Sequence, residues 1–264
     1  MPVLRLSPEL VAEAADILLV RRRHGLIGPC LPEALRPLDL DEAWRIQCSV
    51  RDRLVDCGDA VAGWKCGTGS AERWVLAPIH AREVCEGDTC TTWTEAGGVR
   101  VEPELAFVLG HALPPRPEPY TEREVDAAVV GTRLALEVIH NRYQPGATPD
   151  FLEKLADGLV NGGLVLGPLV DSRQAREAST LSLSVDIEGG RSQTLEGMHP
   201  DGDPRRPLYE LVERLRERGE GLAAGQVVIT GSYAGSVVWP VDRPIRVRFG
   251  DLGTLAVTFL AREA

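Results

Sequence analysis

The sequence predicts an α+β fold in which a helical N-terminal lobe (residues 1–60) lies on a β-rich catalytic body (residues 61–264). Apolar residues recur at helical spacing in the first 60 residues, whereas short apolar runs between turn residues begin at Val61. The 264 residues include 27 Gly and 19 Pro but only 5% aromatic residues, which favours many turns over long helical bundles. We expect the two regions to form one continuous structural domain.

Two helices are expected in the N-terminal lobe. Ser7 can cap the first helix, with Pro8 at its first position, and apolar residues follow at helical spacing. A link rich in Pro and Gly spans residues 25–37. Asp41 is expected to cap the second helix, which runs to about Cys57, and Gly58 is placed to end it. The lobe is therefore expected to be two helices joined by an irregular link.

The body is expected to consist of strands with two helices among them. Thr121 and Glu124 form a capping box at the start of one helix. Leu208, Leu211 and Leu215 mark the apolar face of a second, amphipathic helix. The expected strands are apolar runs bounded by turn residues, at 61–66, 99–109, 134–139, 164–169, 181–187, 226–230, 245–249 and 254–259.

Composition and charge argue against several classes of protein. The net charge is −10 and the pI is near 5.1, without a basic stripe, so nucleic acids and anionic membranes are poor partners. No run approaches the ~20 apolar residues of a membrane span, and the N-terminus does not resemble a signal peptide. We therefore expect a cytoplasmic protein with reduced cysteines, which form no CxxC pair. These are Cys30, Cys48, Cys57, Cys66, Cys85 and Cys90.

The most informative stretch is residues 100–109, RVEPELAFVL. In a strand, Glu102 and Glu104 share one face, and Pro103, which has no N–H, requires an edge or a bulge. Glu137 lies in another apolar run, where a lone acid needs a partner. A hard cation such as Mg²⁺ or Mn²⁺ would relieve the repulsion between such carboxylates. The alternative is that each acid faces the surface beside a Lys or Arg.

Four strings occur in order along the chain: AGWKCGT at 62–68, RVEPELAFVLG at 100–110, ALEVI at 135–139 followed by Arg142 and Tyr143, and GQVVITGS at 225–232. Together they resemble the 2-keto-4-pentenoate hydratase and 4-oxalocrotonate decarboxylase family, a branch of the fumarylacetoacetate hydrolase-like superfamily. The resemblance covers about residues 40–260. It implies that the body is a mixed β-sandwich or roll of fumarylacetoacetate hydrolase-like type, and that the protein is a homo-oligomer. A partner enzyme of the same pathway would fit this family as well.

The resemblance also implies roles for individual residues. Glu102, Glu104 and Glu137 would be the ligands of a bound Mg²⁺ or Mn²⁺. Lys65 and Asp157 would be catalytic, with Lys65 near the carboxylate of a small 2-keto acid substrate. The residues implied in substrate binding are Thr68, Thr230, Gly231 and Ser232.

The implied reaction adds water to a 2-hydroxy-2,4-dienoate of the 2-keto-4-pentenoate type through a metal-stabilised enolate, in the catabolism of aromatic compounds. A decarboxylase of the 4-oxalocrotonate (2-oxo-3-hexenedioate) type is the alternative, because Pro103 and the string API at 77–79 are closer to that branch. Hydratases of the family carry an acid just before a proline downstream of the lysine, whereas no acid precedes Pro78 here. That departure keeps open a catalytically inert accessory protein, and a C–C hydrolase or tautomerase of the same superfamily is a further alternative.

Overall fold

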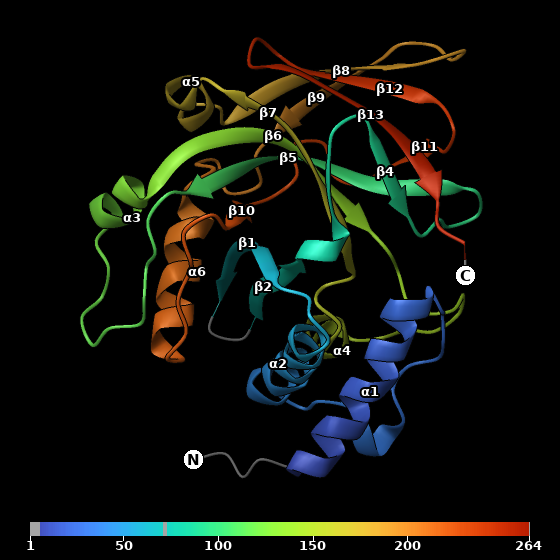
Figure 1. Cartoon of the computed structure of the whole chain (residues 1–264), viewed down its shortest axis with the longest axis vertical. Helices are drawn as coiled ribbons and strands as arrows, with labels where there is room; N and C mark the ends of the chain where they lie inside the picture. Colours follow the sequence, from blue (N-terminus) through green and yellow to red (C-terminus); the bar gives the residue numbers. More distant parts are fainter. Residues whose placement is uncertain (1–5, 71–72, 264) are drawn as a thin grey trace.

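The computed structural model describes residues 6–70 and 73–263, which form two curled β-sheets and a group of helices (Figure 1). The described α-helices are α1 (Pro8–His24), α2 (Leu40–Asp56), α3 (Glu122–Ala128), α4 (Phe151–Ala156), α5 (Ser172–Arg176) and α6 (Arg206–Glu217). Short 3-10 helices, η1 and η2, span Glu33–Leu35 and Ala81–Glu83.

The larger sheet has the strand order β2-β1-β10-β5-β6-β7-β3, and β11 also pairs with β5. Its strands are β1 (Val61–Ser70), β2 (Arg73–His80), β3 (Val84–Glu86), β5 (Gly98–Leu109), β6 (Val129–Ile139), β7 (Asn161–Val170), β10 (Val227–Ile229) and β11 (Val237–Pro240). The long antiparallel pair β5 and β6 lies at its centre, and β1 joins the sheet through a parallel pairing with β10. This strand order brings segments between residues 61 and 240 together in one sheet.

The smaller sheet covers one face of the larger one. Its strand order is β4-β13-β12-β8-β9, with β4 (Thr89–Thr92), β8 (Thr180–Ile187), β9 (Gln193–Met198), β12 (Pro244–Phe249) and β13 (Gly253–Ala261). Figure 1 shows β8, β9, β12 and β13 layered over β5, β6 and β7. Val101 and Leu105 of β5 and Leu136 and Val138 of β6 are buried in the core that includes residues of this sheet. Because side chains alternate along a strand, the neighbouring glutamates face the other way.

The N-terminal helices pack against a helix from the body. Residues of α1 and α2 share one apolar core with Leu155 and Ala156 of α4, and Figure 1 shows these helices grouped at the end opposite the smaller sheet. Ser7 caps α1, as expected. The N-cap of α2 is Asp39 and not Asp41, because the Asp39 side chain accepts the N–H of Glu42. The helical lobe therefore includes a segment that begins 95 residues after the end of α2, which the sequence did not reveal.

The eight expected strands are present, and the two helices expected in the body are α3 and α6. Pro103 lies in the middle of β5, opposite Leu136 of β6. On the other side of β5, β10 pairs with residues 106–108 and β11 with residues 98–101. Pro103 thus occupies a gap between two partner strands, where no ladder requires its missing N–H. The same gap admits the loop that completes the pocket described below.

Cys85 and Cys90 form a disulfide, so the expectation that all six cysteines are reduced is wrong for this pair. Their spacing is not that of a CxxC motif. The turn between β3 and β4 contains Gly87, with φ at +102°, and brings the two Cα atoms to 5.4 Å. Since β3 pairs with β7 and β4 with β13, the bond links the two sheets.

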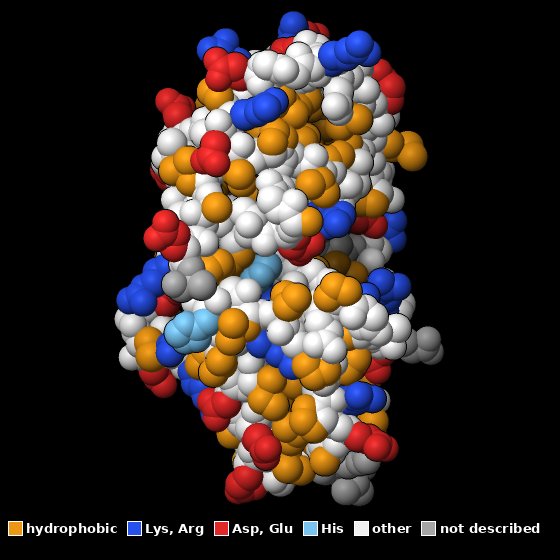
Figure 2. Space-filling view, turned by 90° about the vertical axis from the view of Figure 1, so that its right-hand side faces the viewer, with side chains coloured by type: hydrophobic (Ala, Val, Ile, Leu, Met, Phe, Trp, Pro, Cys, Tyr) orange, Lys and Arg blue, Asp and Glu red, His pale blue; other side chains and the backbone are white. Residues whose placement is uncertain are grey.

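The described residues contain no helix with the length and apolar character needed to cross a membrane. On the face shown in Figure 2, Lys and Arg side chains are interspersed with Asp and Glu, and hydrophobic side chains lie between them. The described residues of this face therefore form no large patch of a single charge sign.

Candidate active site

Three glutamates meet on the face of the larger sheet that points away from the smaller one. Glu102 of β5 lies directly opposite Glu137 of β6 in the antiparallel register, and Glu104 is two residues further along β5. Directly opposite positions place Cβ atoms about 4.5–5.5 Å apart, so like charges there repel. One carboxylate oxygen from each glutamate lies within 4.8 Å of the others. The strand periodicity thus brings together the three residues expected to bind metal.

These carboxylates are largely withdrawn from water. Glu137 is fully buried, and Glu104 is 2% exposed. Burial, together with the neighbouring Glu137 carboxylate, raises the pKa of Glu104 well above its usual range and raises that of Glu102 as well. Glu137 Oε2 is buried without a hydrogen-bond partner in the described part of the chain. An orphaned carboxylate oxygen among repelling carboxylates fits a hard divalent cation, which prefers oxygen ligands.

Lys65 of β1 supplies a positive charge beside the glutamates. Its Nζ lies 2.6 Å from Glu137 Oε1, and the lysine side chain is 13% exposed. Burial disfavours the ammonium, but the carboxylates of Glu137 and Glu102 outweigh it, so the pKa of Lys65 is raised. Asn161 donates to the same oxygen of Glu137 at 2.8 Å. Glu137 is therefore held through Oε1 by two donors, which leaves Oε2 for another partner.

The loop after β10 enters the gap beside Pro103. The N–H of Gly231 donates to Glu104 Oε2 at 2.6 Å. Gly231 has φ at +139°, and a Cβ there would lie 2.8 Å from Pro200 Cγ, so glycine meets both the backbone conformation and the close approach. The backbone of this loop therefore fixes Glu104, while a second loop, which contains Pro200, packs against it.

These elements enclose a pocket of about 280 Å³. The expected site residues that line it are Lys65, Thr68, Glu102, Glu104, Glu137, Thr230 and Gly231. Sequence reasoning missed Cys66, Gly67, Val75, Pro200 and Asp201, which also line it. Burial raises the pKa of the Cys66 thiol well above its usual range, so Cys66 is no thiolate nucleophile. No motif marks Pro200 and Asp201, because only the tertiary fold brings their loop to β1 and β10.

A histidine behind the pocket orients one of its hydroxyl groups. His199 is 1% exposed, and burial lowers its pKa, so its ring is neutral near pH 7. Its Nδ1 accepts the N–H of Asp201 at 3.2 Å, which assigns the ring proton to Nε2. Nε2 then donates to Thr230 Oγ1 at 3.3 Å. Thr230 is left with its own hydroxyl proton to donate toward the pocket.

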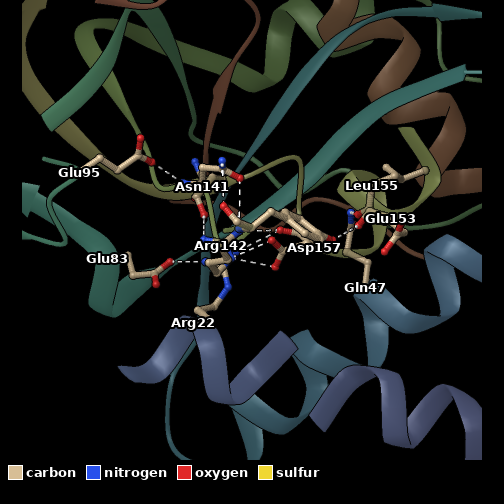
Figure 3. A network of polar contacts seen from close by, with 11 residues as sticks. Arg22, Gln47, Glu83, Glu95, Asn141, Arg142, Glu153, Leu155 and Asp157 are labelled. Atoms are coloured by element: carbon tan, nitrogen blue, oxygen red, sulfur yellow. Dashed lines mark hydrogen bonds and ion pairs between the residues drawn. The ribbon is translucent and has the colours of Figure 1, made fainter. Parts of the chain in front are cut away.

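Two expected site residues do not reach this pocket. Asp157 makes a buried ion pair with Arg142, whose Nε lies 2.8 Å from both carboxylate oxygens (Figure 3). Arg142 Nη1 donates to the Asn161 carbonyl. The hydroxyl of Ser232 donates to the carbonyl of Gly235 at 2.8 Å. Asp157 therefore supports, through Arg142, the position of Asn161, whose side chain donates to Glu137. The Ser232 hydroxyl is hydrogen-bonded to the backbone and does not line the pocket.

Comparisons with known proteins identify a family and several relatives. Residues 72–260 match the sequence profile of the family described as fumarylacetoacetate (FAA) hydrolase C-terminal. A 2-keto-4-pentenoate hydratase of Paraburkholderia xenovorans (strain LB400) is 26% identical over 266 residues, which cover 98% of each chain. A 4-oxalocrotonate decarboxylase of Pseudomonas putida is 26% identical over 230 residues, 83% of this chain and 85% of that protein.

Among solved structures, the 4-oxalocrotonate decarboxylase from Pseudomonas putida G7, complexed with magnesium and adipate, matches this chain with a TM-score of 0.81. The match covers 97% of this chain and 99% of that one, at 20% sequence identity. At this identity the likeness establishes the fold. The expected family resemblance and fold class are both confirmed.

Proposed function

Because the chain belongs to the fumarylacetoacetate (FAA) hydrolase family, we propose that it is a divalent-metal-dependent lyase that hydrates a 2-hydroxy-2,4-dienoate of the 2-keto-4-pentenoate type. The observation that carries the proposal is the buried cluster of Glu102, Glu104 and Glu137 with Lys65 beside it. The hydratase of Paraburkholderia xenovorans, similar over 98% of both chains, supports the choice of reaction.

The three glutamates would hold Mg²⁺ or Mn²⁺, since carboxylates alone suit a hard cation and the set contains neither histidine nor cysteine. When bound, the cation supplies Lewis-acid chemistry, drawing electrons toward the 2-oxo oxygen of a 2-keto acid. The unpartnered Glu137 Oε2 gives the site its clearest free ligand atom. Oxygen ligands do not by themselves separate the two ions.

The chain's own groups bind and protonate the substrate. The Lys65 ammonium donates one N–H to Glu137 and has two more for the substrate carboxylate or for a proton transfer to the carbon skeleton. His199 donates to the Thr230 hydroxyl, which leaves the hydroxyl's own proton for a hydrogen bond to the substrate. Val75 and the backbone of Gly67 and Gly231 complete a pocket sized for a small acid.

A decarboxylase of the 4-oxalocrotonate type is the second candidate. One observation favours it: the segment before Pro78 offers Val75 and no carboxylate to the pocket. A relative of that name is 26% identical, as the hydratase is, but over 83% of this chain. The decarboxylase substrate, 2-oxo-3-hexenedioate, has a second carboxylate. A hydratase substrate of the 2-keto-4-pentenoate type has only one, so the two reactions differ in the charge the pocket must accept.

Turnover with each substrate tests the proposal. In the presence of Mg²⁺, the protein should abolish the ultraviolet absorbance of 2-hydroxypenta-2,4-dienoate and give 4-hydroxy-2-oxopentanoate, identified by NMR. Release of CO₂ from 2-oxo-3-hexenedioate without hydration would favour the decarboxylase. Cleavage of an acylpyruvate, or turnover of none of these compounds, would instead indicate a hydrolase or an inert accessory protein.

The remaining expectations stay predictions from the sequence. These are a homo-oligomeric assembly, a partner enzyme of the same pathway, a place in aromatic compound catabolism, and a cytoplasmic location. So does the expectation that neither nucleic acid nor a membrane is a partner.

A further inference from the structure

The pocket contains more negative than positive charge. Four carboxylates line it, from Glu102, Glu104, Glu137 and Asp201, and among its described lining residues Lys65 is the one cation. The three glutamates and Lys65 belong to the end where the metal and the substrate's 2-oxo acid group would bind. Asp201 is not part of that end of the pocket, and its carboxylate has no role in the proposed reaction.

Asp201 lies beside Thr68 at the outer end of the pocket, which we define as the end away from Lys65. Its Oδ2 accepts the N–H of Thr68 at 3.3 Å. Thr68 follows Lys65 by three residues on β1, which is about 10 Å at the rise of an extended strand. Substrate bound through its 2-oxo acid group at the glutamates and Lys65 would therefore extend its other end toward Asp201.

The position of Asp201 is fixed from both sides. Its own N–H donates to Nδ1 of the buried His199, whose backbone N–H donates to the Ser179 carbonyl. On the other side, the contact with Thr68 ties the carboxylate to β1. Asp201 forms no ion pair in the described part of the chain. Its charge is therefore held at the pocket wall without a cation to neutralise it.

Other charges near the outer end do not offset Asp201. Glu210 of α6 accepts the N–H of Gly69 at 3.2 Å, just beyond the pocket, and adds negative charge there. Arg214, one turn further along α6, donates to the Ser70 carbonyl and lies over the Trp74 ring, outside the pocket lining. The hydroxyl of Thr68 is buried without a hydrogen-bond partner in the described part of the chain. The outer end thus offers a carboxylate and a neutral hydroxyl.

We propose that Asp201 determines specificity by excluding substrates with a second carboxylate at their far end, so that the pocket takes 2-oxo monocarboxylates. The inference rests on the proposed function, because it assumes that a 2-oxo acid binds at the glutamates. Repulsion between the two carboxylates near a protein surface is expected to weaken binding about 10- to 100-fold, equivalent to about 1.4–2.7 kcal/mol. The same carboxylate tolerates an uncharged end and accepts a hydrogen bond from a hydroxyl group there.

A matched pair of saturated acids tests this charge selection by binding alone. 2-Oxohexanoate and 2-oxohexanedioate have the same chain length and differ by one terminal carboxylate. Their dissociation constants are measured by calorimetry on the full chain with Mg²⁺ present. The unmodified protein should bind the monoacid about 10- to 100-fold more tightly than the diacid.

Asp201→Asn keeps an oxygen for the Thr68 N–H and removes the charge, so it should reduce the preference to about threefold or less, mainly by tightening binding of the diacid. Asp201→Ala should do the same and guards against a folding defect specific to Asn. Glu210→Gln removes a neighbouring charge that does not line the pocket and should leave the preference within about twofold.

Equal binding of both acids by the unmodified protein, or binding of neither, would overturn the inference. An unchanged preference for the monoacid in both Asp201 variants would overturn it too. So would a loss of this preference in Glu210→Gln as large as that in Asp201→Asn. Failure of the proposed function is a separate result: the acids would bind with the expected preference, yet the hydroxydienoate would not be turned over. Failure of the inference alone would show turnover of the hydroxydienoate without any charge selection.

Discussion

Asp157 lies in the polar network drawn in Figure 3, and replacing it tests whether the residue supports the fold or takes part in the reaction. Its carboxylate pairs with Arg142, and the two side chains are 2% and 0% exposed. Arg22 lies in the same network, 2.7 Å from Glu83 and donating to the Asp157 carbonyl. Two buried guanidinium groups are thus balanced by two carboxylates. Asp157→Asn removes one negative charge from this balance and preserves the shape of the side chain.

The expected cost is large because Arg142 cannot reach water. Breaking a buried pair by removing one partner costs about 3–5 kcal/mol. Asn retains one acceptor for Arg142 Nε, and the backbone carbonyls of Asp157 and Asn161 still accept from the guanidinium. We therefore expect a loss near the lower limit, about 3 kcal/mol in the free energy of unfolding.

Urea unfolding, followed by the fluorescence of the five tryptophans, measures the change. The matched control is Asp251→Asn, because Asp251 is 97% exposed and pairs with an exposed Arg248, so its loss should cost less than about 1 kcal/mol. A loss below about 1 kcal/mol in Asp157→Asn would refute the reasoning. If the variant also lost turnover at unchanged stability, Asp157 would have the chemical role that the family resemblance implies.

Three further predictions concern the disulfide, two histidines and the lysine. Reduction with dithiothreitol should lower the free energy of unfolding by about 2 kcal/mol, the loop-entropy value for a short loop, and Cys85→Ser should be insensitive to the reductant; an equal effect on the variant would contradict the role of the Cys85–Cys90 bond. Burial lowers the pKa values of His80 and His140 to about 3, so their neutral forms stabilise the fold above the unfolded pKa of 6.5 and this stability is lost as pH falls toward 3. Between pH 7.5 and pH 5.5 the two histidines together should lower the free energy of unfolding by about 2–3 kcal/mol, measured by urea unfolding as the difference in pH dependence between the unmodified protein and the double variant His80→Gln with His140→Gln; identical pH dependences would contradict the assignment. Lys65→Met should lower kcat by about 10²–10⁴-fold while Mn²⁺ still binds, because the ammonium acts on the substrate; a kcat within about threefold of the unmodified protein would exclude that role.

The strand pattern predicted which carboxylates share a face of the sheet because alternation is a local property. Glu102 and Glu104 share a face in any strand, and Glu137 stands out as an acid in an apolar run. The register that places Glu137 opposite Glu102 depends on how β5 and β6 align, which the family resemblance implied and periodicity alone did not.

Features set by tertiary contacts were beyond reach of the sequence. Asp201 lies 136 residues from Lys65, and the two line one pocket only because the loop after β9 packs against Gly231. Arg142 and Asp157 carry no pattern that marks a buried pair. The strand β9 was missed because it pairs only with β8 at a sheet edge and is mostly exposed, so it lacks the apolar alternation that marks a half-buried strand.

The central claim is that Glu102, Glu104 and Glu137 hold a divalent cation, and a calorimetric titration with Mn²⁺ tests it most directly. The unmodified protein should bind one ion per chain. Glu104→Gln, which keeps an oxygen for the Gly231 N–H, should fold with the same circular dichroism spectrum and bind none. An unmodified protein that binds neither Mn²⁺ nor Mg²⁺, or a variant that binds Mn²⁺ as tightly as the unmodified chain, would contradict the claim.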